Sequence, residues 1–198
     1  MARLTFPMAA LAALLLIAAA SSASALCPPK VTIDYVTYAG TGCSWDNTNY
    51  VLSPDYSTVT FIFGGMVATT DGGLANTRKF CQLSFALKYP KGWIFTLGKA
   101  TGRGFADIGA NSLGVYESSY YFSGQTGTPT ISRTFYGPQT KSFEATDKFL
   151  TMVWSECNNV PNLNIKTVVR VQGQKAAMFL DSHDTKFHLA FALFWKPC

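Results

Sequence analysis

The chain has 198 residues, of which 48% are apolar and 14% are charged. This composition argues against intrinsic disorder, and the length predicts a single domain with a substantial core. The net charge of +5 comes from lysines and arginines that are scattered along the sequence. Because they form no basic run or stripe, the charge argues against a nucleic-acid-binding protein.

The N-terminal residues predict secretion. Residues 1–3 give a short, positively charged start, an apolar run follows, and Ala23 and Ala25 form a small-x-small pattern. These are the three regions of a secretory signal peptide, and the apolar run is shorter than the roughly 20 residues of a membrane-spanning helix. We therefore predict a signal peptide over residues 1–25 and one mature domain over residues 26–198, without a membrane span. The protein is expected outside the cell, free or associated with the cell wall.

The mature sequence alternates between apolar and polar residues in several short runs. Strict alternation places every second side chain on one face, so each run predicts a β-strand with one buried face. In the first run, Tyr35 shares the apolar face with Val31 and Ile33. The other runs lie at residues 58–63, 82–89, 115–122, 163–171 and 187–196.

Turn-forming clusters separate these runs, and no stretch of ten residues has a helical period. The pattern predicts an all-β fold, namely an antiparallel β-sandwich of roughly eight to ten strands that disulfides stabilise. A closed barrel is the alternative. Gly102-Arg103-Gly104 lacks the spacing of a phosphate-binding loop and predicts a bend, bulge or turn within a long hairpin.

Five cysteines are expected to form disulfides in an oxidising compartment, and the odd number leaves at least one thiol unpaired or paired with another molecule. Proximity in the sequence favours the pairs Cys43–Cys81 and Cys157–Cys198. Cys27 would then remain in the flexible start of the chain. Four cysteines can pair in three ways, however, and the sequence alone does not choose among them. No close cysteine pair of the metal-binding kind is present, so we predict no metal site and no cofactor.

Eight short motifs run in a fixed order along the mature chain. They are Gly42-Cys43, Thr77–Leu83, Tyr89–Trp93, Arg103–Ala106, Tyr120–Gln125, Val153–Cys157, Leu163–Ile165 and Trp195–Cys198. Together they resemble an uncharacterised family of small secreted proteins, mainly from filamentous fungi, that is known only as a domain of unknown function. The resemblance covers about residues 31–198. It implies a secreted β-rich domain with four family cysteines, which are Cys43, Cys81, Cys157 and Cys198.

The same resemblance implies no activity, substrate or catalytic residue, and Cys27 departs from the family pattern. The residues themselves offer few catalytic candidates. His183 and His188 are five residues apart, an odd separation that places them on opposite faces of a strand. A His-Asp site with Asp181, or two carboxylates facing each other across a groove, would support a secreted hydrolase. The acidic candidates for such a pair are Asp107, Glu117, Glu144, Asp147, Glu156, Asp181 and Asp184. Since no Gly-x-Ser-x-Gly elbow is present, we assign no catalytic residue.

Aromatic side chains point to a binding function instead, because aromatic rings can stack on the apolar C–H faces of sugars. Trp45 lies in a polar segment and is expected to be exposed, and Tyr121 lies on the polar side of the run 115–122. We therefore take Trp45 and Tyr121 as candidate ligand-binding residues. The leading hypothesis is a secreted, non-enzymatic protein that binds cell-wall polysaccharide or an extracellular protein. The alternative is the secreted hydrolase with a carboxylate or His-Asp site.

Overall fold

A computed structural model describes residues 27–180 and 188–198. The predicted signal peptide lies outside these described residues, as do Asp181, His183 and Asp184. Within them the chain forms twelve β-strands and one short 3-10 helix, η2 (Leu74–Asn76). None of the described helices has the length and apolar character needed to cross a membrane.

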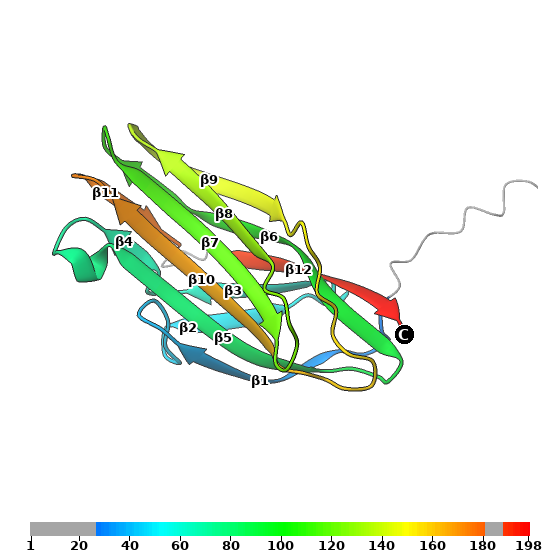
Figure 1. Ribbon diagram of the computed structural model, residues 1–198. Coiled ribbons are helices and arrows are strands. Elements are labelled where there is room, and N and C mark those ends of the chain that lie inside the picture. The colour runs from blue at the N-terminus through cyan, green and yellow to red at the C-terminus, as the bar shows by residue number, and fades with distance from the viewer. Residues whose placement is uncertain (1–26, 181–187) are drawn as a thin grey trace, which may run out of the picture.

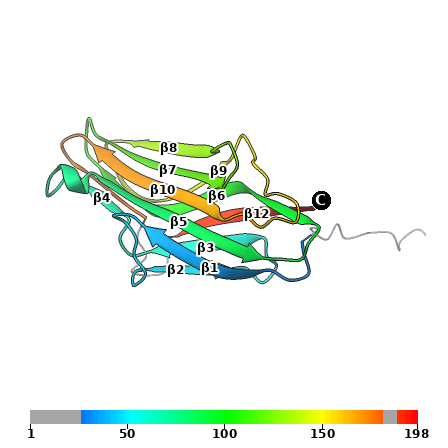
Figure 2. The same cartoon turned by 60° about the horizontal axis from the view of Figure 1, so that its bottom comes forward.

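Two antiparallel sheets pack face to face, as Figures 1 and 2 show. Sheet A has five strands, which in spatial order are β1 (Thr32–Ala39), β5 (Arg78–Lys88), β10 (Leu163–Gln172), β7 (Leu113–Phe122) and β8 (Thr130–Tyr136). Sheet B has seven strands. Six follow the order β2 (Thr48–Leu52), β3 (Thr58–Phe63), β12 (Leu189–Pro197), β6 (Trp93–Ile108), β11 (Ala176–Phe179) and β4 (Val67–Thr69), and β9 (Gln139–Lys148) pairs with β6. The predicted antiparallel β-sandwich is confirmed.

The strand count exceeds the eight to ten that the sequence predicts. The additional strands include β4 and β11, which have three and four residues and are too short to show a period of two. The longer runs behave as expected. In β7 the side chains of Tyr116, Ser118, Tyr120 and Phe122 are fully buried between the sheets, whereas Tyr121 points outward. The alternation in the sequence therefore defines the two sides of this central strand correctly.

The segment Gly102-Arg103-Gly104 lies in the middle of β6, so the prediction of a bend or turn there is wrong. A Cβ atom added to Gly104 would lie 2.1 Å from the backbone oxygen of Phe179 in β11. A Cβ atom on Gly102 would lie 3.4 Å from the ring of Tyr116. Gly104 therefore allows close packing of β11 against β6, whereas a Cβ atom on Gly102 would make an ordinary contact, and neither glycine reverses the chain. The register of β6 instead shifts beside Gly98, opposite β12.

Two disulfides join the pairs that sequence proximity favours, Cys43–Cys81 and Cys157–Cys198. The first is buried and ties the loop before β2 to β5, and the second is exposed and ties the end of β12 to the segment between β9 and β10. Cys27 is free, but it is half-buried against the core, so its expected place in a flexible start is wrong. Burial and the nearby charge of Asp55 raise the pKa of the Cys27 thiol.

Candidate functional site

The outer face of sheet A carries the alternate side chains that do not enter the core. In Figure 1 this face is turned toward the viewer, and in Figure 2 it forms one of the two layers. The register aligns one row across four strands, from Thr37 through Ser84 and Asn164 to Tyr121. Tyr35 pairs with Ala86 at the next outward position of β5. The two tyrosines thus come from strands β1 and β7 and lie toward the same end of one flat face.

We call Tyr35, Ser84, Tyr121, Asn162 and Asn164 the tyrosine patch. Tyr35 is 43% exposed and Tyr121 is 38% exposed, so part of each ring faces solvent. Three interstrand spacings separate β1 from β7, which corresponds to about 14 Å at roughly 4.8 Å per spacing. Short and mostly polar residues form the floor between the two rings, where Ser84 is half-buried and Asn164 is almost fully buried.

Hydrogen bonds hold the patch in place. The hydroxyl of Tyr35 donates to Oδ1 of Asn162 over 2.6 Å. The carboxamide of Asn164, which is almost fully buried, donates to Oγ of Ser123 over 3.0 Å and to the backbone oxygen of Asn162 over 3.4 Å. The Tyr35 ring is therefore positioned before any ligand arrives.

Sequence analysis misplaces Tyr35, which it assigns to the buried face. The structure has a register shift between Ile33 and Tyr35, so Ile33 faces the core, Tyr35 faces outward, and Val36 faces the core again. Such a bulge inserts one extra residue and moves the side chains that follow to the other face. The sequence does carry a signal of the bulge, because the apolar alternation changes phase between Ile33 and Val36.

The other two candidates from the sequence are both exposed, and the structure does not bring them together. Trp45 is 85% exposed in the loop between β1 and β2, where the backbone N–H of Ser44 donates to Oδ1 of Asn47 over 2.7 Å. That loop is tied to β5, because Gly42 N donates to the backbone oxygen of Phe80 over 2.9 Å. Phe80 pairs with Val168 of β10, whereas Tyr121 pairs with Asn164 of the same strand. The two positions on β10 are four residues apart. Tyr121 therefore belongs to the tyrosine patch and Trp45 does not.

The acidic candidates of the described part mostly have local partners. Asp107 accepts a hydrogen bond from Thr140, and Glu156 accepts one from Asn159, each over 2.7 Å. Glu144 pairs with Arg103 over 2.8 Å on the outer face of sheet B. Within residues 27–180 and 188–198, no three His, Cys, Asp or Glu side chains form a group that could hold a metal ion.

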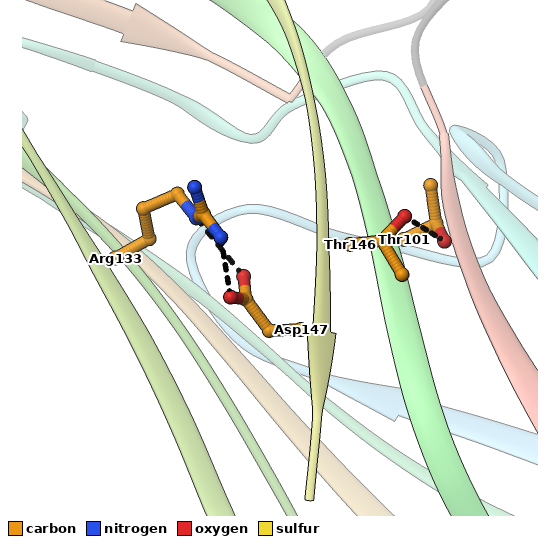
Figure 3. A network of polar contacts seen from close by, with 4 residues as sticks. All are labelled: Thr101, Arg133, Thr146 and Asp147. Atoms are coloured by element: carbon orange, nitrogen blue, oxygen red, sulfur yellow. Dashed lines mark hydrogen bonds and ion pairs between the residues drawn. The ribbon is translucent and has the colours of Figure 1, made fainter.

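One charged pair joins the two sheets, as Figure 3 shows. Arg133 of β8 donates to Asp147 of β9 through Nε at 3.1 Å and through Nη2 at 2.5 Å. These hydrogen bonds raise the pKa of the Arg133 guanidinium. On β6 and β9, the hydroxyls of Thr101 and Thr146 lie 2.8 Å apart. Each of these side chains has a hydrogen-bond partner on a neighbouring strand or on the facing sheet. The network therefore holds the edge of the sandwich together.

His188 also lies near Arg103 and Glu144, immediately before β12. Its backbone oxygen accepts a hydrogen bond from Arg103 N over 2.9 Å. Burial and the charge of Arg103 lower the pKa of the His188 imidazole, and the charge of Glu144 partly opposes them. His183 and Asp181, which the sequence offers for a His-Asp hydrolase site, are outside the described residues.

Comparison with known proteins finds a family model and a relative that match most of the chain. Residues 29–198 match the family model described as "Domain of unknown function (DUF4360)". The chain is also 37% identical over 179 residues to a protein of Arthroderma benhamiae named "Uncharacterized secreted protein", a match that spans 86% of this chain and 73% of the relative.

Solved structures match the chain only at low similarity. TmCBM61 in complex with β-1,4-galactotriose is 10% identical with a TM-score of 0.31, over 83% of this chain and 90% of that one. The family 11 carbohydrate-binding module of Clostridium thermocellum, in complex with a β-1,3-1,4-mixed-linked tetrasaccharide, is 10% identical with a TM-score of 0.23, over 83% and 86% of the two chains. These TM-scores are too low to carry an argument about ligands. The family match and the fungal relative do identify the chain, which belongs to the family called Domain of unknown function (DUF4360).

Proposed function

We propose that this protein is secreted and binds an extracellular polysaccharide, without catalysing a reaction, through the tyrosine patch of sheet A. The observation that carries the proposal is the pair of exposed rings of Tyr35 and Tyr121 on either side of a polar floor. A sugar chain presents apolar C–H faces and a rim of hydroxyls. Aromatic rings can stack on the apolar C–H faces, and short polar side chains can hydrogen-bond to the hydroxyls. This combination of groups is typical of ligand sites.

The position of the patch adds support. It lies on strands, whose side chains are held more precisely than those of loops. The hydrogen bond between Tyr35 and Asn162 restricts the rotation of the Tyr35 ring before a ligand binds. This restriction reduces the entropic cost of binding. The outer face also continues along β5 and β10 beyond the patch, so a polymer could extend along these two strands.

Secretion is part of the proposal. Two disulfides form within the domain, and disulfides persist mainly in oxidising compartments. The relative from Arthroderma benhamiae is named a secreted protein. The predicted signal peptide over residues 1–25 agrees with both.

The test combines a glycan array with retention on insoluble cell-wall polymers. The secreted protein should be retained on at least one polymer, and the variant Tyr35→Ala/Tyr121→Ala should lose most of that retention. Phe194→Ala is a matched control, because Phe194 is 41% exposed but lies on β12 in sheet B. Trp45→Ala tests the other aromatic candidate from the sequence.

Two results would contradict the proposal. One is the absence of retention on every polymer at both low and moderate salt. The other is equal retention of the wild-type protein and the double tyrosine variant. Release of soluble sugar from a retained polymer would instead support the hydrolase, and that assay is run on the same samples.

A further inference from the structure

Two arginines lie together on the outer face of sheet A, away from the tyrosine patch. Arg78 of β5 pairs with Arg170 of β10 in the register, and both residues are exposed. The two strands lie side by side in Figures 1 and 2. Like charges directly opposite each other on neighbouring strands destabilise a sheet. An anion bound between the two guanidinium groups would therefore remove a repulsion that the fold leaves in place.

The described residues do not neutralise this pair. The three ion pairs formed across residues 27–180 and 188–198 include neither Arg78 nor Arg170. The guanidinium of Arg78 instead lies 5.1 Å from the centroid of the Phe80 ring. That cation–π contact orients the side chain without cancelling its charge. A guanidinium group carries paired N–H donors, the geometry that recognises a carboxylate or a sulfate.

A cavity of about 330 Å³ lies at the same place. Its lining includes Arg78, Arg170, Thr77 and Gln172. The hydroxyl of Thr77 already donates to the backbone oxygen of Leu74 over 2.8 Å, so the arginines and Gln172 supply the side-chain donors. The volume is at the small end of the range for ligand pockets, and it suits one charged group or one sugar unit.

The face connects this cavity to the tyrosine patch. Ser84 and Arg78 are six residues apart on β5, which corresponds to about 20 Å at roughly 3.4 Å per residue. Lys166 lies between them on β10, where it pairs with Gln82. One extended chain along β5 and β10 would therefore meet aromatic rings at one end and cationic groups at the other.

We propose that Arg78 and Arg170 form an anion subsite for the carboxylate or sulfate groups of an acidic polysaccharide. The inference rests on the proposed function, because it names the class of polymer that the same face would prefer. The distance between the two sites predicts that a chain of several sugar units is needed to contact both. It also predicts that the contribution of the arginines falls as salt screens their charges.

The experiment measures the affinity of the secreted protein for three soluble polymers, namely a polyuronate, a sulfated glycan and a neutral glycan retained in the test above. Measurements are made at about 25 mM and about 500 mM salt, where screening is weak and strong. The variant is Arg78→Gln/Arg170→Gln. The control is Lys99→Gln/Lys148→Gln, which removes the same charge from another cross-strand pair, on sheet B.

At low salt the arginine variant should bind at least one acidic polymer about tenfold more weakly, should bind the neutral glycan unchanged, and should lose this defect at high salt. A defect on the polyuronate identifies carboxylate as the ligand, and a defect on the sulfated glycan identifies sulfate. An equal loss in the lysine control, or no loss on either acidic polymer, would overturn the inference.

The tyrosine variant separates this inference from the proposed function. If Tyr35→Ala/Tyr121→Ala binds all three polymers like the wild-type protein while the arginine variant is defective, the tyrosine patch fails and the anion subsite stands. If the tyrosine variant is defective and the arginine variant is not, the anion subsite alone fails.

Discussion

The hydroxyl of Tyr35 donates a hydrogen bond of 2.6 Å to Asn162, although the two residues are 127 positions apart in the sequence. The bond joins β1 to the segment just before β10 and fixes the Tyr35 ring at the border of the tyrosine patch. It lies at an exposed position, so its contribution to folding is small. Its importance is expected in ligand binding, where a ring that is already oriented loses less entropy.

Tyr35→Phe should therefore weaken polysaccharide binding about two- to fivefold, equivalent to roughly 0.5–1 kcal/mol, since the ring remains and only its hydrogen bond is lost. Asn162→Ala should have a similar effect, and the double variant should lose no more than either single variant because both remove the same bond. Titration of the retained glycan measures all three. Additive losses in the double variant would show that the bond does not orient the ring.

The two disulfides give a prediction about stability. They close loops of similar length, with separations of 38 and 41 residues, so both should restrict the unfolded chain by about 4 kcal/mol. Cys43 and Cys81 are buried, whereas Cys157 and Cys198 are exposed. Replacing Cys43 and Cys81 by alanine should also leave a cavity in the core and should cost more.

Urea unfolding of Cys43→Ala/Cys81→Ala and Cys157→Ala/Cys198→Ala checks this order. The exposed pair should lower the free energy of unfolding by about 4 kcal/mol, and the buried pair should lower it further. A smaller loss for the buried pair would contradict the account of the core.

The Arg133–Asp147 pair should contribute to holding the two sheets together. It makes two hydrogen bonds between β8 and β9, and such a bidentate pair is stronger than a single-contact surface pair. A double-mutant cycle with Arg133→Ala and Asp147→Ala should give a coupling energy of about 1 kcal/mol. The Lys88–Asp34 pair is the control, because it is more exposed and joins neighbouring strands of one sheet. Its coupling should be about 0.5 kcal/mol or less, and a value equal to that of Arg133–Asp147 would count against the prediction.

His188 should make stability depend on pH. Burial and Arg103 hold its folded-state pKa below the ordinary value of 6.5. Between these two pKa values the unfolded chain binds more protons, so the free energy of unfolding rises with pH through this window and falls as the pH drops through it.

His188→Gln should remove this part of the pH dependence, because glutamine does not titrate. Urea unfolding between about pH 7.5 and about pH 5 should show the wild-type protein losing more stability than the variant as the pH falls. His183→Gln serves as the control for the other histidine. Parallel curves for wild type and His188→Gln would show that His188 keeps its ordinary pKa in the folded protein.

The sequence predicts the sandwich because several of its long strands, among them β5, β7 and β10, alternate without interruption. In the run 115–122, parity alone places Tyr121 outside and Tyr120 inside, as the structure confirms. Parity fails for Tyr35, because the bulge after Ile33 shifts the side chains that follow to the other face. The change of phase from Ile33 to Val36 marks this bulge in the sequence, and the pairing of β1 with β5 shows that Tyr35 is the residue that turns outward.

The cross-strand partners were also beyond prediction from a single sequence. Arg78 and Arg170 are 92 positions apart in the numbering, and only the register of β5 against β10 brings them together. The same holds for Arg133 and Asp147, which lie on different sheets. The pairing of distant strands depends on how all the strands pack, so local sequence patterns do not predict it.

The central claim is that the tyrosine patch is the binding face. It is tested most directly by backbone amide chemical-shift mapping, in which an oligosaccharide from the best-retained polymer is titrated into the labelled protein. The account predicts that the largest shifts follow the outward positions around Tyr35, Ser84, Tyr121 and Asn164 on four neighbouring strands. Shifts concentrated around Trp45, or on the outer face of sheet B around Phe194, would contradict it.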